Sequence, residues 1–291
     1  MNWSQRLGTA GVWRGVKAVD PALARTIEEL GYGTIWQGGS PASDLRPAEE
    51  LLDGTESIVI ATGIVNIWTS DAADLADSYH RIQAHHPGRL LLGIGSGHRE
   101  DNAARTHPVE AMSRYLDVLD ERGVPTEHRV LSALGPRMLA LAAQRSAGTH
   151  PYLTVPSQTG QARTALGSDA LVAPEQTVVL DADPASGRRT ARAFLAHYLT
   201  LVNYTSNMQR AGFTAEDLAE GGSDNLVDRI IAHGDAAVLG AAVWAHLDAG
   251  ADHVCVQVQP ADGNVIPALR AVAADLRLRA TPYPPPPGPA H

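Results

Sequence analysis

The stretch from Ser57 to His98 constrains the fold of this chain most. Residues 58–67 form a β-branched apolar run that is too short to cross a bilayer and suits a strand buried on both faces. Residues 71–85 have helical spacing, and residues 89–94 form a second apolar run that leads into glycines. A strand, a helix and a strand of these lengths make a right-handed unit with parallel strands.

Ligands of such units lie beyond the carboxyl ends of the strands. Asn66 and Trp68 follow the first strand of this unit, and Ser96 and His98 follow the second. The sequence therefore predicts that these four residues face one site.

Apolar runs and helical patterns alternate along the rest of the chain without a repeat or an internal linker. This pattern predicts one (β/α)8 barrel over residues 1–280, followed by a proline-rich tail, 281–291, with no reason to be ordered. The expected strands are residues 9–13, 33–37, 58–67, 89–94, 129–134, 151–155, 175–181 and 253–259.

Composition excludes several classes of function. The net charge of −9 and the pI of about 5.7 argue against a nucleic-acid-binding surface. The single cysteine, Cys255, cannot form an internal disulfide and fits a reducing compartment. No signal peptide is visible at the N-terminus. We therefore expect a cytoplasmic protein that acts on a small molecule, with no membrane partner.

Two glycine-containing turns could hold an anion. Residues 93–97, GIGSG, follow a strand, and successive backbone amides there could form an anion nest. Residues 133–137, ALGPR, place a helix N-terminus and Arg137 after another strand. An ordinary turn and an ordinary helix start explain the two patterns equally well.

The sequence offers few groups for acid–base or metal chemistry. It contains no H-E-x-x-H motif, no cysteine cluster and no obvious pair of carboxylates at strand ends, so we expect no metal site. His98 and His150 could line a cavity, whereas His246 and His253 fit structural roles.

Trp13, Trp36 and Trp68 stand at the ends of the first three expected strands. Three tryptophans around one mouth would favour a flat aromatic ligand, although tryptophans also serve packing. Such a composition indicates a site that holds a cofactor.

Taken together, the motifs resemble those of the luciferase-like flavin and deazaflavin oxidoreductases, in particular the actinobacterial coenzyme F420-dependent branch. The resemblance extends to about Gln259. It rests on GVW (11–13), LGYG (30–33), IW (35–36), ATGIVNIW (61–68), PGRLLLGIG (87–95), ALGPRM (133–138), AGTHPY (147–152), NY (203–204) and AGADHV (249–254).

The resemblance implies a barrel of the bacterial luciferase type with an insertion before the seventh strand. It implies a cis peptide bond between Gly63 and Ile64, in a bulge that supports the back of a deazaflavin ring. The ring would contact Gly63, Ile64, Val65 and Asn66. The phosphate would contact the backbone of Ser96, Gly97 and His98, or that of Ala133, Leu134 and Gly135.

The chain departs from the family at the end of the second strand. Many relatives carry an acidic residue or a histidine there, whereas this chain has Gln37 followed by Gly38, Gly39 and Ser40. The catalytic residues that we expect instead are His98, His150 and Trp13.

Three functions remain open at this point. The first is an F420-dependent oxidoreductase that transfers a hydride to or from a small organic substrate. The second is an FMN-dependent luciferase-like monooxygenase, and the third is a non-catalytic deazaflavin-binding protein. By analogy with the family we also expect a homodimer that pairs through the helices at residues 47–52 and 71–85.

Overall fold

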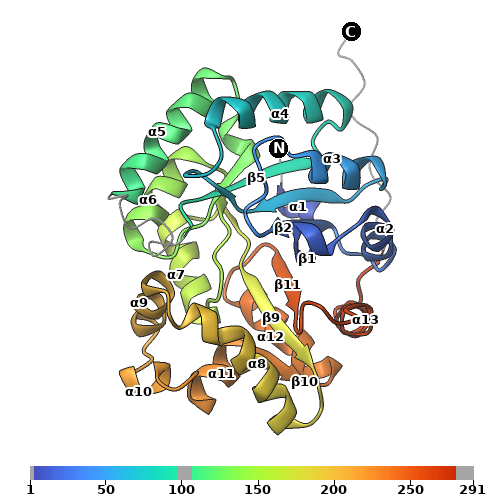
Figure 1. Ribbon diagram of the computed structural model, residues 1–291, viewed down its shortest axis with the longest axis vertical. Coiled ribbons are helices and arrows are strands. Elements are labelled where there is room, and N and C mark those ends of the chain that lie inside the picture. The colour runs from blue at the N-terminus through green and yellow to red at the C-terminus, as the bar shows by residue number, and fades with distance from the viewer. Residues whose placement is uncertain (1–2, 98–106, 280–291) are drawn as a thin grey trace.

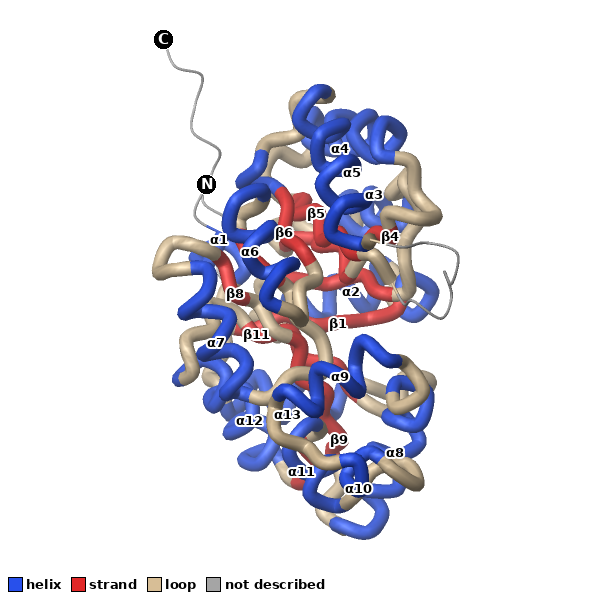
Figure 2. The backbone as a smooth tube through the Cα atoms, turned by 90° about the vertical axis from the view of Figure 1, so that its left-hand side faces the viewer, coloured by secondary structure: helices blue, strands red, loops and turns tan. Residues whose placement is uncertain are grey.

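The computed structural model describes residues 3–97 and 107–279. A curled, parallel sheet forms its centre, and helices cover the outside of the sheet (Figures 1 and 2). The order of the strands is β10-β9-β11-β1-β2-β3-β5-β6-β7-β8, with β4 paired to β5. The strands are β1 (Ala10–Gly15), β2 (Thr34–Gly38), β3 (Val59–Gly63), β4 (Val65–Asn66), β5 (Leu90–Gly95), β6 (Arg129–Leu131), β7 (Gly148–Thr149), β8 (Leu171–Val172), β9 (Glu175–Leu180), β10 (Ala232–Gly234) and β11 (Val254–Val258).

The chain itself connects β8, at one end of this curled sheet, to β9, the second strand from the other end, because only Ala173 and Pro174 separate them. The amide of Ala173 donates to the carbonyl of Thr149 in β7, and the amide of Cys255 in β11 donates to the carbonyl of Pro174. The backbone between β8 and β9 is therefore hydrogen-bonded to β7 on one side and to β11 on the other. The prediction of an α/β barrel is confirmed.

Helices follow most strands and pack on the outer face of the sheet (Figure 1). Local sequence sets their ends: the Asp71 side chain, for example, accepts from the amides of Ala73 and Asp74 at the start of α4. The helices are α1 (Trp3–Leu7), α2 (Pro21–Glu29), α3 (Arg46–Asp53), α4 (Ala72–His85), α5 (Pro108–Glu121), α6 (Pro136–Arg145), α7 (Pro156–Leu166), α8 (Pro184–Tyr198), α9 (Val202–Arg210), α10 (Ala215–Leu218), α11 (Asp224–Ile230), α12 (Ala236–Asp248) and α13 (Ile266–Asp275).

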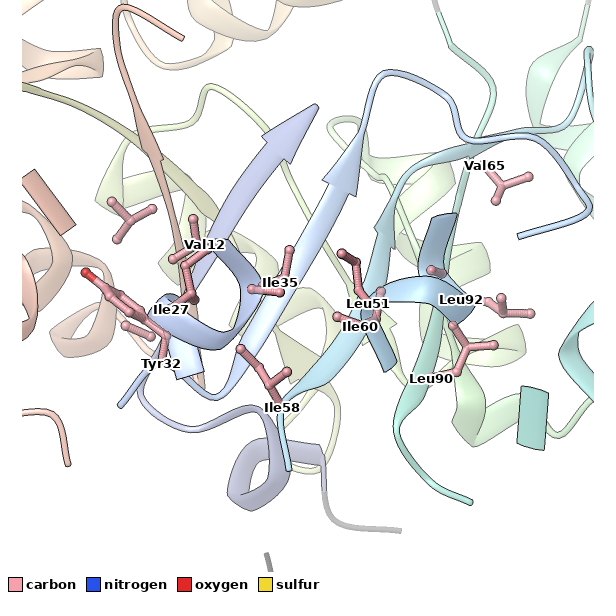
Figure 3. Packing of buried hydrophobic residues seen from close by; sticks show 14 of the residues in the cluster. Val12, Ile27, Tyr32, Ile35, Leu51, Ile58, Ile60, Val65, Leu90 and Leu92 are labelled. Atoms are coloured by element: carbon pink, nitrogen blue, oxygen red, sulfur yellow. The ribbon is translucent and has the colours of Figure 1, made fainter. Parts of the chain in front are cut away.

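Alternate residues of each strand face two different cores. Ile35 belongs to the larger cluster between sheet and helices, together with Val12 and Ile60 (Figure 3). The next residue, Trp36, belongs to a smaller cluster inside the barrel that includes Cys255. Each strand therefore sends one set of side chains towards the helices and the other towards the barrel axis.

Two expectations about elements are corrected by the structure. Residues 151–155 are not a strand, because β7 is only Gly148–Thr149 and the backbone then turns, with a φ of 53° at Leu153. The helical insertion, α8 to α11, follows strand β9 instead of preceding it. Within this insertion, residues 199–201 separate α8 from α9.

Candidate active site

The break between β3 and β4 forms a bulge at the mouth of the barrel. Ala61 pairs with Leu91 and Val65 pairs with Ile94, so β3–β4 uses one residue more than β5 over the same distance. The peptide bond between Gly63 and Ile64 is cis, as expected.

Small residues beneath the bulge let the two strands approach closely. A Cβ atom on Gly93 would lie 1.9 Å from the carbonyl oxygen of Thr62, and one on Gly95 would lie 2.7 Å from Cδ1 of Ile64. The hydroxyl of Thr62 also accepts from the amide of Gly93 at 2.8 Å and donates to its carbonyl at 2.7 Å. Gly93 and Gly95 of the GIGSG motif therefore leave the space that the bulge occupies.

The expected ring-contacting residues divide between two faces. Val65 is fully buried in the core between sheet and helices, so its side chain points away from the barrel axis. Asn66 is nearly buried, and its Oδ1 accepts from the amide of Trp68 at 3.0 Å. A Cβ atom on Gly97, where φ is +59°, would lie 2.5 Å from Nδ2 of Asn66. The structure thus brings Asn66 and Gly97 together, after the neighbouring strands β4 and β5.

Trp13 and His150 meet beside Gly63. A Cβ atom on Gly63 would lie 3.0 Å from Nε1 of Trp13 and 3.4 Å from Nε2 of His150. A Cβ atom on Gly38 would lie only 1.8 Å from Cζ2 of Trp13. The indole of Trp13 therefore occupies the space that a side chain at position 38 would need.

This packing explains the departure at the end of the second strand. Gln37 lies on the same face of β2 as Ile35, whose side chain packs towards the helices. The inward position is Gly38, which has no side chain. Trp13 takes that space, and neither polar atom of the buried Gln37 side chain has a hydrogen-bond partner in the described part of the chain.

The hydrogen bond at Nδ1 fixes the tautomer of His150. Nδ1 lies 2.7 Å from the carbonyl oxygen of Ala173, which can only accept, so Nδ1 carries the proton and Nε2 presents a lone pair. Burial lowers the pKa of His150 to about 4, despite this bond, so the ring is neutral at neutral pH. Among the described residues, neither His150 Nε2 nor Trp13 Nε1 has a partner.

His253 and His246 have their ring nitrogens satisfied, as structural histidines do. His253 donates from Nδ1 to Gly8 O at 2.8 Å and accepts from Trp36 Nε1 at 3.1 Å. His246 bonds Thr159 at 2.7 Å and Gln176 at 3.1 Å. The structural roles expected for these two histidines fit the geometry.

The three tryptophans do not share one wall. Trp13 stands at the mouth, whereas Trp36 is fully buried inside the barrel. Trp68 lines a cavity of about 290 Å³ between α4 and α5, with Tyr115 and Arg114. Another cavity, of about 550 Å³, is lined by Trp3, Leu171 and their neighbours near the amino ends of the strands. The expected ring of three tryptophans is therefore wrong.

The two expected anion-binding turns follow neighbouring strands. Ser96 and Gly97 follow β5, and residues 133–135 follow β6. Helix α6 begins at Pro136 after Gly135 without a side-chain cap, which leaves amides of its first turn open to a ligand. Arg210 of α9 reaches the same turn and donates to Leu134 O at 3.3 Å. His98 lies outside the described residues.

A buried carboxyl group escaped the sequence analysis. Glu175 of β9 is 1% exposed, and burial raises its pKa to about 7. Its oxygens accept from the amide of Leu153 at 3.2 Å and from the hydroxyl of Thr177 at 2.5 Å. A glutamate at the start of an otherwise apolar strand was the available signal.

A tyrosine cluster beside Glu175 was missed as well. Tyr152 donates to Oε1 of Gln257 at 2.7 Å, so Tyr198, whose hydroxyl lies 2.9 Å away, donates to Tyr152. Tyr204 of α9 packs on both rings, and the ring of Trp13 lies 5.7 Å from that of Tyr152. The insertion therefore forms one wall of the site.

Residues 3–97 and 107–279 contain no group of three or more His, Cys, Asp or Glu residues placed to hold a metal ion. The helices within these ranges are too short or too polar to cross a membrane.

The sequence of the chain was compared with models of known protein families and with curated proteins. Residues 20–122 match the family model described as luciferase-like monooxygenase. No curated protein matches the chain as a whole or in part.

Several solved structures share the fold over almost the whole chain. One is a coenzyme F420-dependent tetrahydromethanopterin reductase from Methanopyrus kandleri, with 14% identity, a TM-score of 0.72, and 93% and 99% of the two chains covered. Another is an F420-dependent secondary alcohol dehydrogenase in complex with an F420-acetone adduct, with 13% identity, a TM-score of 0.70, and 91% and 98% covered.

A third similar structure holds a flavin. It is the oxygenating constituent of 3,6-diketocamphane monooxygenase from Pseudomonas putida in complex with FMN, with 13% identity, a TM-score of 0.70, and 95% and 100% covered. The chain thus has the fold of these luciferase-like proteins, and its residues 20–122 are similar to the luciferase-like monooxygenase family.

Proposed function

We propose that this protein is a coenzyme F420-dependent oxidoreductase that transfers a hydride between the deazaflavin and a small organic substrate. The observation that carries the proposal is the bulge at Gly63–Asn66, beside which Trp13 Nε1 and His150 Nε2 lie buried without a hydrogen-bond partner among the described residues. Buried polar atoms without a partner are costly, and they are common where a ligand completes the bonding.

The residues at the mouth fit a flat ring with an anionic tail. The backbone of Gly63, Ile64 and Asn66 would support the ring, while the turns at Ser96–Gly97 and Ala133–Gly135 would receive the phosphate through their amides. The chain has a single lysine, Lys17, so arginines such as Arg137 would supply positive charge. The bound deazaflavin would supply the hydride chemistry, and the protein would supply orientation.

The unprotonated Nε2 of His150 suits proton transfer at the substrate. It presents a lone pair to the space beside Gly63, and Trp13 presents an N–H to the same space. Trp13 and His150 are therefore the catalytic candidates that the described residues support. The role expected for His98 stays a prediction.

A second candidate function is an FMN-dependent luciferase-like monooxygenase, which the family match over residues 20–122 favours. Titration of the purified protein with F420 and with FMN, followed by cofactor fluorescence, distinguishes the two. Saturable binding of F420 without binding of FMN supports the first function, and the reverse result supports the second. Bound cofactor that no compound of a substrate library can reduce or oxidise would indicate a non-catalytic binding protein.

We also propose a homodimer, but not through the surface first expected. Leu75, Tyr79 and Ile82 form the apolar side of α4, and all three are buried in the core of the same chain, so they cannot supply an interface. Light scattering at micromolar concentration tests the assembly, and a monomeric mass would contradict it.

A further inference from the structure

The segment that follows strand β7 carries His150 and is held by the backbone that leads from β8 into β9. The amide of Glu175 donates to the carbonyl of Pro151 at 2.9 Å, as in a regular parallel ladder. The other ladder partner of residue 151 would be the carbonyl of Ala173, but proline has no amide hydrogen to donate. That carbonyl accepts from Nδ1 of His150 at 2.7 Å instead. The imidazole therefore takes the place of a backbone donor.

The ladder ends at Leu153, where a φ of 53° turns the backbone away from an extended path. In a regular ladder the amide of Leu153 would donate to the backbone carbonyl of Glu175. It donates to Oε2 of the Glu175 side chain instead, at 3.2 Å, and the hydroxyl of Thr177 donates to Oε1. Glu175 thus holds residues 150–153 at two points, through its own amide and through its carboxyl group.

We propose that Glu175 is a positioning residue of the candidate active site: its carboxyl group fixes this segment and thereby places His150 and Tyr152 in the wall of the site. This inference rests on the proposed function, in which His150 is a catalytic candidate. Tyr152 packs against Trp13 with 5.7 Å between the ring centroids, so a shift of the segment would disturb that contact as well. Glu175 itself acts through the segment, because its two carboxyl oxygens are engaged by protein donors.

The surroundings of Glu175 are neutral. Its side chain is 1% exposed and lies inside the barrel. The titratable groups that face it are Cys255 of β11, Tyr152 of the segment, Tyr198 of α8 and Tyr204 of α9. Burial, together with the negative charge of Glu175, raises the pKa of each of these four groups, so all are neutral near pH 7. Ionisation of Glu175 therefore places a charge among neutral groups, where a buried carboxylate draws hydrogen-bond donors towards it.

The pKa values of Glu175 and His150 are far apart, so titration distinguishes the two groups. Burial raises the pKa of Glu175 to about 7 and lowers that of His150 to about 4. Because Glu175 holds the segment through its carboxyl group, its ionisation near pH 7 should shift the side chains that the segment carries. A support that is only structural would not change with pH in this range.

The test uses the full chain without cofactor and follows the response of the site to the charge of Glu175. Nitrogen-15 NMR would follow the indole N–H of Trp13 and the imidazole nitrogens of His150 between about pH 5.5 and about pH 8.5. Trp13→Phe and His150→Asn identify the two sets of signals. In Glu175→Gln the side-chain oxygen still accepts from the amide of Leu153, but the group cannot ionise.

Glu28→Gln is the matched control, because Glu28 also holds a turn through backbone amides. Its carboxyl oxygens accept from the amides of Glu56, Ser57 and Ile58, which precede β3 at the amino end of the barrel. A third variant, Glu175→Leu, removes both hydrogen bonds of the carboxyl group and keeps a side chain of similar size.

We expect both sets of signals to shift with a common midpoint near pH 7 in the unmodified chain and in Glu28→Gln, and not to shift in Glu175→Gln. Glu175→Leu should displace both sets at every pH, and if that variant does not fold, the comparison with Glu175→Gln decides. No response to pH, an equal response in Glu175→Gln, or unmoved signals in a folded Glu175→Leu protein would overturn the proposal. The expected response in a protein that binds no F420 would instead refute the proposed function alone.

Discussion

The imidazole of His150 stacks on the indole of Trp36, with 3.9 Å between ring centroids and 14° between the ring planes. Trp36 donates to His253, which in turn donates to Gly8 at the amino end of β1. A chain of aromatic contacts thus runs through the barrel interior to His150, whose Nε2 has no partner in the part of the chain that the structure describes. The interior of the barrel positions this nitrogen.

The first prediction concerns Trp36. Trp36→Phe should leave Nε2 of the buried His253 without a donor and should open a small void, lowering the free energy of unfolding by about 2–4 kcal/mol. Urea denaturation measures this change. Trp244→Phe, at a position 44% exposed, is the matched control and should change it by no more than about 0.5 kcal/mol. Equal effects of the two substitutions would contradict the structural role of Trp36.

The second prediction concerns the pH dependence of stability. Burial lowers the pKa values of His150, His246 and His253 to about 4 from an unfolded value of 6.5. Between these pH values the unfolded chain binds protons that the folded chain does not. Stability should therefore fall as the pH drops from 6.5 to 4, by up to about 1.4 kcal/mol per pH unit for each histidine.

Glu175 acts in the opposite direction. Burial raises its pKa from 4.5 to about 7, so its contribution to stability is full below pH 4.5 and is lost as the pH rises to 7. Glu175→Gln removes this opposing effect and should steepen the loss of stability between pH 7 and pH 4.5. Urea midpoints of both proteins across this range check the signs, and an unchanged slope would show that Glu175 does not titrate there.

The sequence predicts the structure correctly where the apolar pattern of a segment matches the way that segment packs in the fold. The alternation of apolar runs and helices predicts the barrel, and the bulge at residues 63–66 follows from glycine placement and from the family resemblance. The prediction of a strand at residues 151–155 is wrong, because Tyr152, Leu153 and Val155 are buried against the inserted helices α8 and α9. A pattern of burial alone does not tell a strand from an irregular segment under an insertion.

The site was harder to predict, because it depends on contacts between distant strands. The sequence predicts Trp13 and His150 as candidates, but their meeting at Gly63 depends on the absence of a side chain at Gly38. Glu175 was missed because a single charged residue at the edge of an apolar run reads as the end of a strand. Only the register between β9 and β11, where Glu175 pairs with Cys255, shows that this carboxyl group points inward.

The third prediction concerns Gly38. Gly38→Ala would place a Cβ atom 1.8 Å from the present position of the Trp13 indole and should force that ring to move. We expect a changed tryptophan signal in near-ultraviolet circular dichroism and a loss of about 1–3 kcal/mol of stability. Gly15→Ala, where no atom lies within 4 Å of the new Cβ, is the control and should leave both unchanged. An unaltered spectrum of Gly38→Ala would show that Trp13 does not depend on this space.

The last prediction concerns the anion-binding turn after β5. Gly97 has a φ of +59°, and a Cβ atom there would lie 2.5 Å from Nδ2 of Asn66, so Gly97→Val should distort the turn. We expect F420 affinity, measured by fluorescence titration, to fall at least about tenfold, because the backbone amides could no longer converge on the phosphate.

Gly123→Val supplies the control for backbone strain. Gly123 has a similar φ of +72°, but a new Cβ would meet no atom within 4 Å, and the residue lies in the turn after α5. Both substitutions force a β-branched residue into the left-handed region, at a cost of about 1–3 kcal/mol of stability each. Only Gly97→Val should also weaken F420 binding. Unchanged affinity in that variant would assign the phosphate to the turn at Ala133–Gly135, where the open amides of α6 are the alternative receptor.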